Sequence, residues 1–110
     1  MKIERQVARF RTSIEALQVN ESPGTGTFVQ DISALGMKIE TSMPFALRDL
    51  VSLKFALPGE PEEIVVGGKV MWIRPTLTSP PRFLVGLKLF LPQWQMDHLG
   101  RCWQGYKVVE

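Results

Sequence analysis

The most constraining feature of the sequence is an alternation of apolar and polar residues that recurs along most of its length. Val51, Leu53 and Phe55, for example, alternate with Ser52 and Lys54. A period of two is typical of a β-strand with one face in the core and the other in solvent. The same period runs through residues 10–19, 27–32, 35–39, 64–72 and 83–89. The pattern therefore predicts about six strands.

The prolines favour the same division of the chain. Seven of them fall between the predicted strands, where a missing N–H removes no hydrogen bond of a sheet. They are Pro23, Pro44, Pro58, Pro61, Pro75, Pro80 and Pro81. Strands joined by short turns form an antiparallel sheet, and closing that sheet removes its exposed edges. We therefore predict an all-β fold, a six-stranded antiparallel β-barrel over about residues 9–91.

The apolar spacing changes after Leu91. Pro92 suits the first turn of a helix. Met96, Leu99 and Trp103 then recur at intervals of three and four, which is the period of a helix. We expect a C-terminal helix over about residues 92–104 that covers one mouth or flank of the barrel.

Composition is that of one globular domain. The chain has 110 residues, of which 45% are hydrophobic and 22% charged, close to the averages for soluble proteins. We expect a single domain over residues 1–110. Cys102 is the only cysteine, which excludes an internal disulfide. Without an apolar signal core or a run of about 20 apolar residues, a cytoplasmic protein that does not insert into membranes is expected.

Few residues could carry catalysis. The only histidine, His98, lies four positions before Cys102. That pair lacks the further ligands of a metal site and the third member that would orient a nucleophile and its base. We therefore expect no enzymatic activity, no metal and no cofactor.

Two short motifs carry complementary binding chemistry. Arg5 and Arg9 form RxxxR before the first predicted strand, and Asp31, Ser33 and Gly36 form DxSxxG between the second and third. A carboxylate accepts from the N1–H and N2–H₂ edge of guanine, and a hydroxyl adds a donor or acceptor. An arginine fork donates to guanine O6 and N7 and pairs with phosphate. The set fits a guanine nucleotide with accessible phosphates.

This combination resembles the PilZ domain family of bacterial cyclic di-GMP receptors, whose signature is RxxxR followed by [DN]xSxxG. The likeness extends to residues 36–41, 68–72 and 85–90, so it covers roughly residues 4–91. It implies a six-stranded barrel with a flanking C-terminal helix. It also implies a receptor that binds cyclic di-GMP and signals to a protein partner, which the sequence does not identify.

The resemblance also implies residue roles. Arg5 and Arg9 would hold phosphate and the Hoogsteen edges of the guanines. Asp31 and Ser33 would contact guanine polar atoms, and Gly36 would let the ligand lie against the backbone.

Trp72 matches a position where some family members place a tryptophan against guanine. Stacking of this kind is worth about 1–3 kcal/mol. Because Trp72 has the same strand parity as Val66 and Val70, a place in the barrel core is an equal expectation.

One residue departs from the family pattern. Many members carry an arginine immediately before RxxxR, whereas this chain has Glu4. An acidic residue there repels phosphate, and it leaves the ligand stoichiometry and affinity open.

The basic N-terminal arm suggests a mechanism. Extended, it separates Arg5 from Arg9 by up to about 13 Å, so it must wrap to bring both to one ligand. We expect residues 1–8 to be mobile without ligand and ordered with it, which changes the surface that a partner meets.

Two alternatives remain. The chain could be a PilZ-like adaptor that acts through protein contacts without nucleotide. It could also be a small barrel that binds single-stranded nucleic acid. The net charge of +2 and the alternating aromatic residues disfavour DNA or RNA as a partner.

Overall fold

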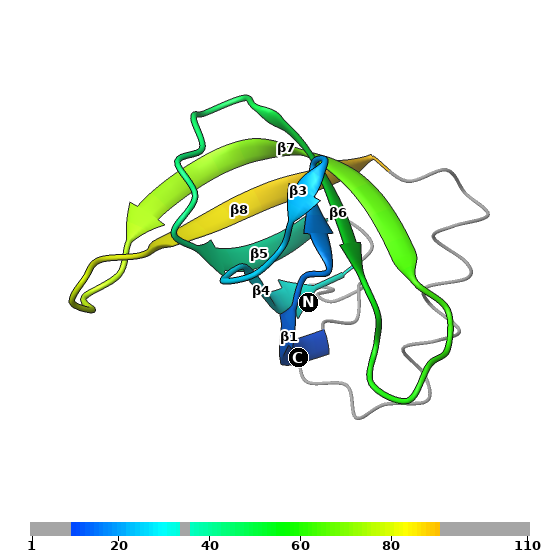
Figure 1. Cartoon of the computed structure of the whole chain (residues 1–110). Helices are drawn as coiled ribbons and strands as arrows, with labels where there is room; N and C mark the ends of the chain where they lie inside the picture. Colours follow the sequence, from blue (N-terminus) through cyan, green and yellow to red (C-terminus); the bar gives the residue numbers. More distant parts are fainter. Residues whose placement is uncertain (1–9, 34–35, 91–110) are drawn as a thin grey trace, which may run out of the picture.

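The computed structural model describes residues 10–33 and 36–90. Within them the chain is all β (Figure 1). The strands are β1 (Phe10–Glu15), β2 (Gln18–Val19), β3 (Ser22–Pro23), β4 (Phe28–Ile32), β5 (Gly36–Thr41), β6 (Leu50–Phe55), β7 (Ile64–Pro75) and β8 (Phe83–Phe90). The predicted all-β class is confirmed for these residues, but the predicted count of six strands is wrong. The C-terminal helix expected over 92–104 lies outside the described residues.

All eight strands belong to one curled sheet with the order β1-β4-β5-β8-β7-β6-β2-β3. Every neighbouring pair is antiparallel. Figure 1 shows β7 and β8 as long, curved strands that lie side by side and reach beyond their neighbours. The described part of the chain contains no helix. It therefore contains no helix that is long and apolar enough to span a membrane.

The strand count differs because the first predicted strand bends. It splits into β1, which pairs with β4, and β2, which pairs with β6 at the other end of the sheet. The Ala16 N–H donates to the Thr27 carbonyl at 2.8 Å, and the Leu17 N–H donates to the Lys54 carbonyl at 2.7 Å. Two adjacent residues thus connect the two ends of the curled sheet. The short β3 accounts for the remaining difference.

Two prolines are placed within strands, contrary to the prediction. Pro23 ends β3, the last strand in the sheet order, and Pro75 is the final residue of β7. On an outer strand, or at the end of a strand, a backbone N–H need not donate to a neighbouring strand. The missing N–H of proline is therefore tolerated at both positions.

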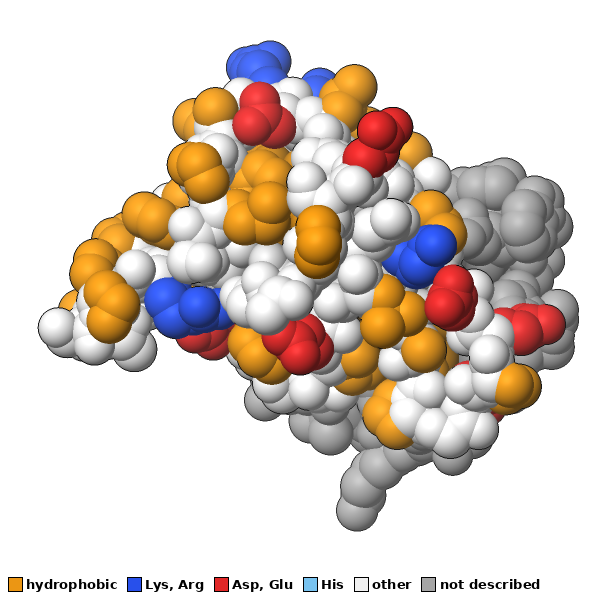
Figure 2. Space-filling view, in the orientation of Figure 1, with side chains coloured by type: hydrophobic (Ala, Val, Ile, Leu, Met, Phe, Trp, Pro, Cys, Tyr) orange, Lys and Arg blue, Asp and Glu red, His pale blue; other side chains and the backbone are white. Residues whose placement is uncertain are grey.

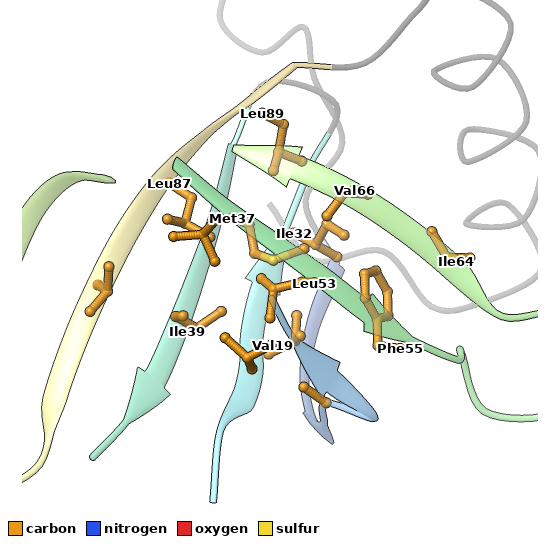
Figure 3. Close-up of a cluster of buried hydrophobic side chains, with 14 of the residues drawn as sticks. Val19, Ile32, Met37, Ile39, Leu53, Phe55, Ile64, Val66, Leu87 and Leu89 are labelled. Atoms are coloured by element: carbon orange, nitrogen blue, oxygen red, sulfur yellow. The ribbon is translucent and has the colours of Figure 1, made fainter. Parts of the chain in front are cut away.

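The core fills the concave side of the curled sheet. Val29, Ile39, Leu53, Phe55 and Val85 are fully buried, and the labelled side chains of Figure 3 converge on the same interior from facing strands. Full burial of such a side chain stabilises the fold by about 1.5–3 kcal/mol. On the face shown in Figure 2, acidic and basic side chains are interspersed among hydrophobic ones. No single charge sign dominates that face.

Candidate functional site

The candidate site lies on the outer face of the sheet, where β4, β5, β8 and β7 are neighbours. Asp31 pairs with Lys38, Lys38 pairs with Gly86, and Gly86 pairs with Trp72. These residues form one row that crosses four strands. Residues in register across a sheet project to the same face. The row therefore places an acid at one end, an indole at the other, and a lysine and a glycine between them.

A bulge in β7 brings Trp72 to this face. Val70 pairs with Leu87 and Trp72 pairs with Gly86, so Met71 is an extra residue on β7. One extra residue reverses the faces of the side chains that follow. Val70 is accordingly buried, whereas Trp72 is 36% exposed. The expectation from strand parity that Trp72 belongs to the core is wrong.

The indole of Trp72 lies directly over Gly86. A Cβ atom at Gly86 would fall 2.1 Å from both Nε1 and Cε2 of the indole. Only a residue without a side chain leaves room for the ring there. The guanidinium carbon of Arg74 lies over the same ring, 5.0 Å from its centroid, within the range of a cation–π contact.

A second bulge places Asp31. Val29 pairs with Ile39 and Asp31 pairs with Lys38, so Gln30 is the extra residue on β4. Val29 and Ile39 point into the core, and the bulge turns Asp31 to the outer face with Lys38. Asp31 is nevertheless only 7% exposed.

Ser33 and Gly36 close a turn after β4. The Ser33 N–H donates to the Gly36 carbonyl at 2.8 Å, and the Gly36 N–H donates to Ser33 Oγ at 3.3 Å. Ser33 is 5% exposed. A Cβ at Gly36 would lie 2.9 Å from the Leu87 carbonyl oxygen. Glycine thus allows β5 to start close against β8.

These residues line one pocket of about 480 Å³. Four of the six predicted site residues are brought together there: Asp31, Ser33, Gly36 and Trp72. The other two, Arg5 and Arg9, lie outside the described residues. The residue after Arg9 is Phe10, and it pairs with Ile32, the residue before Ser33. The chain that follows RxxxR therefore enters the sheet beside DxSxxG.

Sequence reasoning missed the cations of the pocket. Lys38, Lys88 and Arg74 line it, and Lys69 pairs with Lys88 in the next row. Glu40 is near the same face, but its carboxylate accepts from Arg82 Nε at 2.9 Å. The pocket thus has a local excess of positive charge, which favours an anionic ligand. Lysines on strands follow the ordinary pattern of a solvent-exposed face, so no sequence signal distinguishes them.

The site offers no metal centre in the described part of the chain. No group of three or more His, Cys, Asp or Glu side chains is gathered there in a way that could hold an ion. His98 and Cys102 lie outside the described residues.

Comparison with known proteins identifies the family. A family model of the PilZ domain matches residues 3–104. The chain belongs to the PilZ domain family. A search of curated proteins found no significant match.

A solved structure agrees with this assignment at the level of the fold. The Bacillus subtilis inhibitor of motility, MotI/DgrA, superposes with a TM-score of 0.67 at 19% sequence identity. The match covers 89% of this chain and 48% of that protein, so the PilZ domain described here spans about half its length.

Proposed function

We propose that this PilZ domain is a receptor or adaptor that binds cyclic di-GMP and passes the signal to a protein partner. The observation that carries the proposal is the row from Asp31 to Trp72, which crosses one cationic pocket. In this proposal the protein is cytoplasmic and has no enzymatic activity of its own.

The dimensions of the row favour a dinucleotide. The backbones of Asp31 and Trp72 are separated by three inter-strand spacings, about 14 Å. Because the Trp72 indole lies over Gly86, the ring is about two spacings, roughly 10 Å, from Asp31. A carboxylate at one end can accept from a guanine edge, and an indole at the other can stack on a base. Lys38, between them in the row, can pair with phosphate. A single base reaches one end at a time, whereas two guanines joined through phosphates can engage both.

The test is calorimetric titration of cyclic di-GMP into the wild type and into Arg9→Ala. We expect selective binding by the wild type at about micromolar affinity or better. Loss of a charged hydrogen-bonding partner should weaken binding by roughly ten- to a hundredfold in Arg9→Ala. GTP and cyclic di-AMP are the controls. If no nucleotide gives heat, the domain acts through protein contacts alone and the receptor proposal is wrong.

The N-terminal arm carries the signal in this proposal. Residues 1–8 should order when ligand binds, because Arg5 and Arg9 must wrap around it. Amide hydrogen exchange with and without cyclic di-GMP checks this, and slower exchange in the arm is expected with ligand. Equal exchange in both states would contradict an arm-based signal.

A further inference from the structure

We infer that Arg74 is a specificity-determining residue that exchanges partners, from the Trp72 indole in the free protein to the nucleotide in the complex. This inference rests on the proposed function. It adds a residue that lies outside both RxxxR and DxSxxG. It also assigns a use to the guanidinium–indole contact on the wall of the pocket.

Only one face of the Trp72 ring is open to a ligand. The other face lies against Gly86, so close that a Cβ there would fall 2.1 Å from ring atoms. The Arg74 guanidinium lies over the ring at 5.0 Å from its centroid, and the backbone of β8 leaves it no place on the Gly86 side. Arg74 therefore covers the face on which a guanine base would stack.

Arg74 has little else to hold it there. Among the described residues, its guanidinium forms no ion pair. Glu40 and Arg74 flank Leu84 in one row, but the Glu40 carboxylate accepts from Arg82 Nε and Gln30 Nε2, both at 2.9 Å. A cation–π contact at an exposed site is weak. A base can thus displace the guanidinium at small cost.

The displaced guanidinium gains a better partner. Phosphate and the O6 and N7 atoms of guanine accept two hydrogen bonds from one arginine fork. Arg74 is two residues from Trp72 on the same strand, so a base stacked on the indole brings these acceptors within its reach. Lysine has the charge but neither the fork nor the flat surface. The exchange therefore selects a ligand that combines a stacking base with guanine or phosphate acceptors.

The test compares Arg74→Ala and Arg74→Lys with Lys54→Ala, which removes a cation that pairs with Glu63 at 3.6 Å outside the pocket. Loss of a charged hydrogen bond should weaken cyclic di-GMP binding by about tenfold or more in Arg74→Ala. Arg74→Lys should fall between Arg74→Ala and the wild type, and Lys54→Ala should bind like the wild type. The affinity of Arg74→Ala should also depend less on ionic strength, because one screened attraction is gone.

The displacement of Arg74 from the Trp72 ring by the ligand is tested by a measurement other than affinity. Trp94 and Trp103 are changed to Phe so that Trp72 is the only tryptophan, and acrylamide quenching of the selectively excited tryptophan fluorescence is measured with and without ligand. Without ligand, acrylamide should quench Trp72 more strongly in Arg74→Ala than in the single-tryptophan protein that keeps Arg74, because the Trp72 ring is then uncovered. At saturating ligand, the two should be protected equally by the stacked base.

The outcomes separate this inference from the receptor proposal. If the wild type binds no cyclic di-GMP, the receptor proposal fails. If the wild type binds and Arg74→Ala binds within twofold, with the same salt dependence, only the role of Arg74 is wrong. Ligand-free quenching that is equal in Arg74→Ala and its parent would likewise overturn it.

Discussion

Gly86→Ala is expected to weaken cyclic di-GMP binding by about a hundredfold or more, while the protein stays folded. The new Cβ would lie 2.1 Å from Nε1 and Cε2 of Trp72 and 2.7 Å from Cδ1, far inside van der Waals contact. These atoms belong to a side chain at the surface, so the indole can tilt away without moving the sheet. The stacking surface is then lost, and the displaced ring narrows the pocket.

Calorimetry gives the affinity of Gly86→Ala, and near-ultraviolet circular dichroism reports the position of the indole. Gly67→Ala is the matched control, because it adds the same methyl group on β7 where no atom lies within 4 Å. Gly67→Ala should bind like the wild type. Wild-type affinity in Gly86→Ala would show that the indole on Gly86 is not part of the ligand site.

Local patterns in the sequence were sufficient to predict most strands and to place DxSxxG between two of them. Alternation marks a strand wherever one face is buried. β5 and β6 follow it closely, and β8 follows it in its second half. The Ser33–Gly36 turn depends on residues a few positions apart. Such features are specified by neighbours in the chain, which the sequence shows directly.

The errors arose where a single residue changes the geometry. Met71 is one extra residue in β7, and it moves Trp72 from the face of Val70 to the opposite one. The alternation stops there, because residues 70–73 are all apolar, but that run does not indicate which of its residues is the extra one. At the bend the apolar positions do change parity, from Ile14 and Ala16 to Leu17 and Val19. The prediction of one strand over residues 10–19 overlooked that change, although the two halves pair with opposite ends of the sheet.

The remainder of the site depends on the register between distant strands. Lys38 and Gly86 become neighbours of Asp31 and Trp72 only through three ladder pairings. Those pairings are fixed by burial of the opposite face of each strand and by the two bulges. The sequence does not show which residues of distant strands pair. It therefore predicts the motif residues but not the row that they form across the sheet.

Gly24→Ala is expected to destabilise the fold by about 3 kcal/mol, the upper end for overpacking a closed site. Gly24 is buried beside the segment that connects the two ends of the sheet. A Cβ there would lie 2.4 Å from the carbonyl oxygen of Ala16 and 2.6 Å from its carbonyl carbon. Both are backbone atoms, so no rotamer change relieves the collision. Relief requires movement of the residues that hydrogen-bond to Thr27 and Lys54.

Urea unfolding measures this effect, again with Gly67→Ala as the control, which should change the free energy of unfolding by no more than about 0.5 kcal/mol. Gly24→Ala and Gly86→Ala make the same chemical change with opposite expected results. Gly24→Ala should lose stability, but its folded fraction should bind cyclic di-GMP with wild-type affinity, because Gly24 does not line the pocket. Gly86→Ala should lose affinity and keep its stability. If Gly24→Ala were as stable as the wild type, the backbone at Ala16 would be able to move away from the new methyl group without cost, contrary to this prediction.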